Sequence, residues 1–359
     1  MDYYVRNVMC KNELQSQVID LLRFPMAVAV VVSHYGMYLA VDAGGIIKFL
    51  RLLSQLGARL AVPCFFFISG FLFYQQLHNW DWDVWKKKIR RRIRTLFLPY
   101  ILYIIIAFFV YWLYALIQGT QIPIYQQFIQ DGGMKIFWGT NGNIPLGPQA
   151  APLDAPLWFI RDLIYYSIAS PLIFLFVART RIVGILALCM TSLVLPQFVP
   201  EGLVFFSIGA YLQIENKNIL ELVGQWKWTV YATAFVLLLA IYFFFDYRRY
   251  IELFFILFGI GTSFGVAADF LKTSRIQVNP FLVRSSFFIF AIHEILILNE
   301  ISIPLVLHLL PGNGVIWDCL RFLLTPAFAI LLCLLLLYLL ERWMPRTISL
   351  LTGNRRSLL

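Results

Sequence analysis

An arginine and a histidine lie inside the first apolar stretch of the chain, where hydrocarbon side chains would be expected. Arg23 and His34 belong to the segment DLLRFPMAVAVVVSH. At about 1.5 Å and 100° per helical residue, the step between them spans roughly 16 Å and almost three turns, so both side chains share one face. Ionisable residues inside a membrane helix usually face the bundle interior and mark a functional site. There, an imidazole can exchange a proton near neutral pH, and a guanidinium can bind an anionic group.

A carboxylate extends this polar stripe toward the amino terminus. Asp20 lies one helical turn before Arg23. Arg23 is expected about four residues into the membrane and His34 about fifteen, past the bilayer midplane. Pro25 lacks an N–H and can kink the helix beside Arg23. A structural alternative stays open, in which Arg23 snorkels from the helix end and His34 bonds a neighbouring helix.

A second segment, RLAVPCFFFISG, begins at Arg59 and ends with Ser69 and Gly70. Arg59 lies at the predicted outer end of its stretch, where cations are uncommon. We therefore expect Arg59 to contact an anionic side chain or a substrate. Small residues allow membrane helices to approach closely, so Ser69 and Gly70 predict a tight helix contact.

Two later segments carry further candidate residues. Trp158 opens the fourth apolar stretch, and Arg161 and Asp162 follow slightly deeper. Because neighbours in a helix do not face each other, Arg161 and Asp162 are expected to pair with other helices. In the ninth stretch, His293 lies beside Glu294, whose carboxylate could orient or charge-tune the site. In the alternative interpretation, Trp158 is an ordinary interfacial tryptophan, and His293 and Glu294 only form polar contacts between helices.

The composition indicates a membrane protein. Of 359 residues, 60% are hydrophobic and 13% are charged, and the mean hydropathy is +0.76, unlike a soluble globular domain. We predict an all-α, polytopic membrane helix bundle that forms a single domain over 1–359. Stretches long enough to cross a core of about 30 Å predict about ten transmembrane helices, near 19–40, 57–77, 96–117, 156–178, 182–199, 202–214, 228–245, 250–271, 283–308 and 316–340.

The distribution of Lys and Arg predicts the orientation of the bundle. Most of the 29 Lys and Arg residues fall on one side when the amino terminus is placed inside, as the positive-inside rule requires. Both termini are then cytoplasmic, and the Gly- and Pro-rich segment 118–155 is an outer loop. The net charge of +10 reflects topology and anionic lipid, and it does not indicate nucleic acid binding.

A cytoplasmic basic segment at 79–95 precedes the third stretch. Trp and Ile recur on one helical face, with Lys and Arg around the others, as in a helix lying on a membrane surface. The segment could simply anchor the chain on anionic lipid. Alternatively, Arg91 and Arg94 bind the phosphates of a cytosolic ligand. The five cysteines are scattered, so neither a metal site nor a disulfide is predicted.

In their order along the chain, these segments resemble the acyltransferase-3 family of integral membrane O-acyltransferases, which modify bacterial surface glycans. The most specific features are the arginine and histidine of the first span and the Phe-Phe-x-x-Ser-Gly segment of the second. Pro25 departs from the family pattern, and no hydrolase-like domain is expected after the tenth stretch. The matching positions are Arg23, His34, 59–70, Arg91, Arg94, Pro99, Tyr100, 157–160 and 286–293.

The resemblance implies transfer of an acyl group, acetyl or succinyl, from cytosolic acyl-CoA to a hydroxyl of a surface or lipid-linked glycan. We expect His34 to be the general base or to carry the acyl group itself, and Arg23 to position the donor. Arg91 and Arg94 are expected to bind donor phosphates. The residues expected on the acceptor side or in supporting roles are Asp20, Arg59, Ser69, Trp158, Arg161, His293 and Glu294.

The resemblance also predicts a multi-pass protein of the bacterial inner membrane. Acyl-CoA would be a co-substrate, with no permanently bound cofactor, and the sequence does not predict an oligomeric state. The rival hypothesis is a polysaccharide or lipid exporter or flippase, in which the same buried charges line a pathway. Exporters that work by alternating access usually contain an internal repeat, which we do not find in this sequence.

Overall fold

The structure, a computed structural model, describes residues 2–39, 45–77, 79–119, 133–139, 146–273 and 275–353, and over these ranges it contains no strand. The longer helices are α1 (Asp2–Gly36), α2 (Ile46–Tyr74), α4 (Leu98–Gln118), α8 (Ser170–Val194), α9 (Glu201–Ile214), α11 (Lys227–Phe243), α12 (Arg248–Lys272), α13 (Pro280–Ile292) and α15 (Val315–Trp343).

Shorter helical elements connect or extend these helices. Those in α-helical geometry are α3 (Trp82–Arg92), α6 (Met134–Trp138), α7 (Trp158–Ile168), α10 (Ile219–Gln225), α14 (Ile303–Leu309) and α16 (Pro345–Leu351). The π-helical segments are η1 (Ile93–Phe97) and η5 (His293–Ser302), and the 3-10 turns are η2 (Pro148–Ala150), η3 (Ala155–Leu157) and η4 (Phe245–Tyr247).

Six helices of the described chain are long and apolar enough to cross a membrane. Two bent helix pairs raise this number to eight if each pair is one span: α10 with α11, bent by 86°, and Pro280–Ile295 with Ile297–Leu309, bent by 62°. α9 has only 14 residues, fewer than the roughly 20 that a span needs. The predicted ten spans and the cytoplasmic termini are therefore not confirmed and stay predictions.

The predicted boundary between the fourth and fifth stretches coincides with a kink inside α8. Arg181 has a non-helical backbone there, with φ of 51° and ψ of −134°. Before α8, the N–H of Ala169 still donates to the carbonyl of Tyr165, so α7 leads into α8 with little interruption. The chain thus breaks between 178 and 182, where the sequence predicts the end of one stretch and the start of the next.

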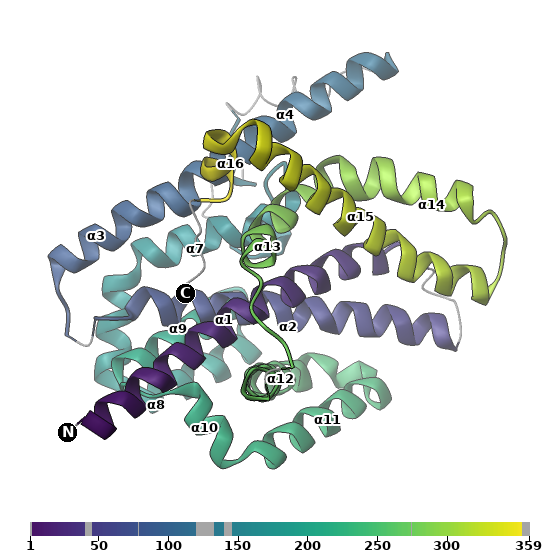
Figure 1. The fold of residues 1–359 in the computed structure, drawn as a ribbon. Helices are drawn as coiled ribbons and strands as arrows, with labels where there is room; N and C mark the ends of the chain where they lie inside the picture. Colours follow the sequence, from purple (N-terminus) through teal and green to yellow (C-terminus); the bar gives the residue numbers. More distant parts are fainter. Residues whose placement is uncertain are drawn as a thin grey trace.

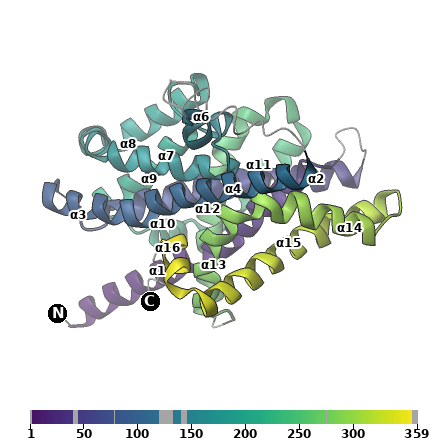
Figure 2. The same ribbon diagram turned by 90° about the horizontal axis from the view of Figure 1, so that it is seen from above.

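α1 crosses the middle of the bundle in Figure 1, and its amino-terminal turns project from the bundle in Figure 2. It packs against α2, α12, α13 and α15. Seen from above, α7 and α8 lie on one side of α4, and α15 lies on the other (Figure 2). α1 ends at Gly36, so His34 lies in its last turn and nearer a helix end than the predicted span 19–40 implies. Because α2, α12, α13 and α15 pack around α1, the polar residues on its inner face lie between helices.

Glycines allow α2 and α9 to pack closely. A Cβ at Gly70 would collide with the carbonyl oxygen of Phe206, and a Cβ at Gly209 would collide with that of Phe67. Neither position can take a side chain unless the partner helix moves. The tight helix contact predicted from Ser69 and Gly70 is confirmed, and its partner is α9.

α3 carries the predicted amphipathic segment, and none of its residues is buried. Asp81 caps it by accepting hydrogen bonds from the backbone N–H groups of Val84 and Asp83 at 3.1 and 2.7 Å. These two bonds hold the pKa of the Asp81 carboxyl below its usual range. The indole N–H of Trp85 donates to the hydroxyl of Ser170 at 2.9 Å. This side of α3 therefore contacts protein, not only lipid.

Candidate active site

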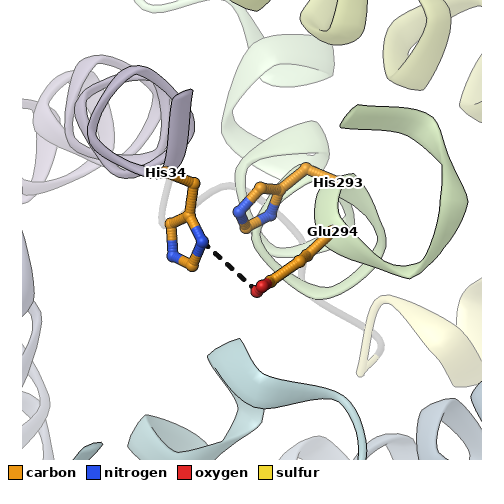
Figure 3. A group of neighbouring side chains, drawn as sticks. All are labelled: His34, His293 and Glu294. Carbon is orange, nitrogen blue, oxygen red and sulfur yellow. Dashed lines mark ion pairs between the residues drawn. The ribbon is translucent and has the colours of Figure 1, made fainter. Parts of the chain in front are cut away.

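His34 and Glu294 meet between α1 and η5. The Nδ1 atom of His34 lies 3.2 Å from Oε2 of Glu294, and both side chains are 22% exposed. Figure 3 shows the two side chains pointing toward each other. A carboxylate accepts a hydrogen bond only from a protonated nitrogen, so a hydrogen bond between these two atoms requires the proton on Nδ1. In the neutral ring, Nε2 then has the lone pair that can take a proton from a substrate.

His293 lies against the ring of His34. The two ring centroids are 4.9 Å apart and the rings are edge-on. His293 is fully buried, and its Nδ1 lies 3.0 Å from each of the carbonyl oxygens of Ile289 and Phe290. The backbone changes from α-helix to π-helix at His293, and π-helical turns are frequent at functional sites. Both His293 and Glu294 face His34 at this transition (Figure 3).

A cavity of about 1220 Å³ opens beside His34. Its walls come from α1, α2, α12, the connection between α8 and α9, and residues 146–150 of the predicted outer loop. Trp158 and Phe66 form an aromatic part of the wall, so Trp158 is not simply an interfacial residue facing lipid. An apolar cavity with a few convergent polar groups is typical of a ligand site. Residues 120–132 and 140–145 of the predicted loop 118–155 lie outside the described residues.

Arg59 lies on the wall of the same cavity, between two carboxylates. Its Nη1 is 2.8 Å from Oε2 of Glu201, and its Nη2 is 3.0 Å from Oε2 of Glu252. The predicted anionic contact of Arg59 is confirmed, although the sequence does not identify the two glutamates. The predicted start of this stretch near residue 57 is wrong, because α2 begins at Ile46 and Arg59 lies within the helix.

Arg161 and Asp162 pair with each other, so the prediction that they pair with different helices is wrong. Nη2 of Arg161 is 2.8 Å from Oδ1 of Asp162. The long arginine side chain folds back to its neighbour, which the direction of the Cα–Cβ bonds alone does not predict. Arg161 also donates to the carbonyls of Trp138, Gly147 and Ala150, and Asp162 accepts from the N–H of Gly147. The pair fixes two described pieces of the predicted outer loop to α7.

Asp154 is a buried carboxyl that no sequence pattern singles out. Its side chain is 2% exposed, and neither carboxyl oxygen has a hydrogen-bond partner within the described part of the chain. Burial raises the pKa of Asp154 well above its usual range, and the charge of Glu294 raises it further. Asp154 therefore tends to stay protonated at a pH where an ordinary carboxyl is ionised.

Arg23 pairs with Asp20 on α1. Nη1 of Arg23 lies 2.9 Å from Oδ1 of Asp20, whose side chain is fully buried, whereas that of Arg23 is 15% exposed. The two residues continue the polar stripe toward the amino terminus of α1. Arg23 does not line the cavity beside His34, so a continuous passage between Arg23 and His34 stays a prediction.

Two basic residues of α3 turn toward the protein, and no sequence pattern singles out either of them. Lys88 and Arg92 are half-buried. The guanidinium of Arg92 lies 5.5 Å from the ring centroid of Phe73 and donates to the backbone carbonyl of Ser69 at 3.2 Å. Its charge interacts with that of Arg23. The helical register of α3 decides which cations face inward, and the composition of the basic segment does not reveal it.

The predicted donor residues Arg91 and Arg94 are exposed. They lie on the same short stretch as Arg92, around the junction of α3 and η1. Exposed guanidinium groups remain accessible to a ligand in solution, so their predicted role is compatible with their position and stays a prediction.

Comparison with known proteins places these residues in a family. The family described as "Acyltransferase domain" matches residues 17–340, a range that includes every site residue discussed above. The chain belongs to this acyltransferase family. The resemblance on which the sequence analysis relied is therefore confirmed.

The comparison also finds one similar protein whose name indicates a biosynthetic role. The "Succinoglycan biosynthesis protein ExoH" of Rhizobium meliloti (strain 1021) is 31% identical over 181 residues, which make up 49% of this chain and 46% of that protein. The alignment thus spans about half the length of this relative. No solved structure matches the chain.

Proposed function

We propose that the protein transfers an acyl group from cytosolic acyl-CoA to a hydroxyl of a surface or lipid-linked glycan. Membership of the acyltransferase family supports the transfer. The observation that carries the proposal is the His34–Glu294 contact beside a cavity of about 1220 Å³. A relative named for succinoglycan biosynthesis supports a polysaccharide acceptor. Acetyl and succinyl groups are both candidates for the transferred group.

In the proposed reaction, Nε2 of His34 removes the proton of the acceptor hydroxyl while the oxygen attacks the thioester carbonyl. Glu294 holds Nδ1 and stabilises the positive charge that the ring gains. When the C–S bond breaks, His34 returns the proton to the departing CoA sulfur, and the ring is neutral again. A positioned base contributes a rate factor of about 10² to 10⁴. The alternative chemistry is attack of His34 on the thioester to form an acyl-histidine.

The two substrates would approach His34 from different ends of α1. We assign the acceptor to the cavity, where Trp158 and Phe66 offer apolar faces and Arg59 a charged group. We assign the phosphates of CoA to Arg91, Arg92 and Arg94, because phosphate is bound best by charge-assisted hydrogen bonds. Of these three cations, Arg92 interacts with the charge of Arg23. The thioester would then have to cross roughly 16 Å along α1 to reach His34, a length suited to the extended pantetheine arm.

A transfer assay separates this proposal from the exporter hypothesis. The purified full-length protein is reconstituted in vesicles and supplied with acyl-CoA, labelled in its acyl group, and with an acceptor oligosaccharide. We expect free CoA thiol and labelled oligosaccharide to appear together, and only when both substrates are present. Movement of the oligosaccharide across the vesicle membrane with an intact thioester would contradict the proposal and support an exporter.

A further inference from the structure

Three possible metal ligands converge at the junction of α1 and η5. His34, His293 and Glu294 each offer one ligand atom, and these atoms all lie within 4.8 Å of one another (Figure 3). Two histidine nitrogens and one glutamate oxygen form a donor set that zinc uses in sites with an open fourth position. The scattered cysteines, from which the sequence analysis predicts no metal site, do not bear on this cluster.

The buried Nε2 atom of His293 is a second, independent indication of a ligand. A carbonyl oxygen only accepts hydrogen bonds, so the two carbonyls at 3.0 Å from Nδ1 place the proton of the neutral ring there. The lone pair is then on Nε2, which is buried and has no hydrogen-bond partner in the residues that the structure describes. A buried acceptor without a partner costs about 1–3 kcal/mol. Metal-bound histidines usually show this arrangement, with the other ring nitrogen donating to a carbonyl or carboxylate.

The spacing suits a small transition-metal ion after a modest adjustment. Bonds of about 2.0–2.1 Å in tetrahedral geometry place ligand atoms roughly 3.4 Å apart. The 3.2 Å between Nδ1 of His34 and Oε2 of Glu294 is already close to this value. As a metal ligand, Nδ1 gives up the proton that it shares with Glu294, and the proton of the neutral ring is then on Nε2. The separations of up to 4.8 Å must shorten by as much as about 1.4 Å to reach tetrahedral spacing, which side-chain rotation can supply. Two imidazoles favour Zn²⁺ over Mg²⁺ or Ca²⁺, which prefer oxygen ligands.

We propose that His34, His293 and Glu294 bind Zn²⁺ reversibly and that the bound ion inhibits acyl transfer. His34 and Glu294 are each 22% exposed and His34 lines the cavity, so the ion can enter and its fourth position faces the cavity. A histidine with one nitrogen on the metal and a proton on the other can no longer accept a proton. The inhibition, but not the binding, rests on the proposed function.

Binding is tested with Co²⁺ as a spectroscopic substitute for Zn²⁺. The full-length protein is purified in detergent through a tag without histidine, because a polyhistidine tag would itself bind metal. We expect one Co²⁺ per chain, with the strong visible absorption of a tetrahedral complex, and we expect Zn²⁺ to abolish this absorption by displacement. Excess Mg²⁺ should leave it unchanged. Absence of the absorption, or displacement by Mg²⁺ as readily as by Zn²⁺, would overturn the proposal.

Variants locate the site within the chain. His293→Ala and Glu294→Gln should each weaken Co²⁺ binding by at least about tenfold. His308→Ala is the matched control, because His308 is exposed and lies outside the cluster; it should bind as the wild type does. Glu294 is partly exposed, so Glu294→Gln remains informative if His293→Ala does not fold. Unchanged affinity in Glu294→Gln, or equal loss in His308→Ala, would refute the assignment.

The two proposals fail in distinguishable ways. If Zn²⁺ binds and inhibits transfer, and a chelator restores it, both are supported. If transfer is active but no metal binds, only the metal site is refuted. If Zn²⁺ binds at these three residues while transfer continues at the same rate, the inhibition is refuted, and so is the role of His34 as the base.

Discussion

Glu294 is the residue that distinguishes a catalytic His34 from a histidine that only joins two helices. We predict that Glu294→Gln lowers kcat by about 10²- to 10⁴-fold with little change in KM for acyl-CoA. Glutamine cannot stabilise the imidazolium with a negative charge. Glu300→Gln is the control, because Glu300 is exposed and accepts a hydrogen bond from Tyr114 instead. Steady-state kinetics measure kcat and KM for the two variants. Equal kcat values for Glu294→Gln and Glu300→Gln would exclude the role assigned to Glu294.

Asp154 predicts a pH dependence of stability. An unfolded aspartate has a pKa of about 3.9, and burial raises the folded value. The folded state therefore holds more protons between these two values, and stability falls as the pH rises through them. We predict that Asp154→Asn raises the melting temperature by a few degrees at pH 8 and by much less at pH 4. Melting curves in detergent test this, with the exposed Asp246→Asn as the control; an equal gain at both pH values would be inconsistent with the prediction.

The individual candidate residues could be found from the sequence, but their partners could not. Charge inside an apolar stretch was enough to single out Arg23, His34 and Glu294. The contact between His34 and Glu294 joins distant parts of the chain, and helical periodicity indicates a face without indicating what lies opposite. The error at Arg161 has the same origin, because a flexible side chain reached Asp162 against the direction of its Cβ.

At the scale of elements, the packing of α2 against α9 depends on glycine. We predict that Gly70→Ala lowers stability by about 1–3 kcal/mol, because the added methyl group meets the backbone carbonyl of Phe206. Gly57→Ala on the same helix is the matched control: its Cβ would lie 3.5 Å from the Cβ of Ala29, an ordinary contact. Thermal unfolding of both variants measures the difference. If the two variants melt at the same temperature, the close approach of α9 is not needed for stability.

The all-helical architecture was predicted correctly, because apolar stretches of sufficient length leave the backbone few alternatives in a membrane; the ten predicted spans are not confirmed, since six helices of the described chain, or eight with the bent pairs, are long enough. The break near Arg181 was predicted because charge interrupts the apolar run there. The π-helical turn at His293 was not predicted, since it changes the hydrogen-bond register without a clear signal in composition. The early start of α2 was also missed, because Lys48 and Arg51 made its first turns resemble a loop.

In the whole molecule, the cavity and the basic helix α3 must face opposite sides of the membrane if the acceptor and acyl-CoA enter from opposite sides. We predict that a cysteine at Gln149, which lines the cavity, reacts with a membrane-impermeant maleimide in intact cells. A cysteine at Lys87, which is exposed on α3, should react only after the cells are permeabilised. Both are introduced into a variant whose five native cysteines are replaced by alanine. Labelling of the cysteine at position 87 in intact cells would contradict the assigned orientation.

His34 performs the proton transfer in the proposed reaction, and the His34→Ala variant removes the proton acceptor from the site. The purified variant is supplied with labelled acyl-CoA and acceptor oligosaccharide, beside the wild type and His308→Ala. We predict transfer at least about 100-fold slower in His34→Ala, with membrane insertion and acyl-CoA binding retained, and an unchanged rate in His308→Ala. Transfer by His34→Ala at the wild-type rate would contradict the account.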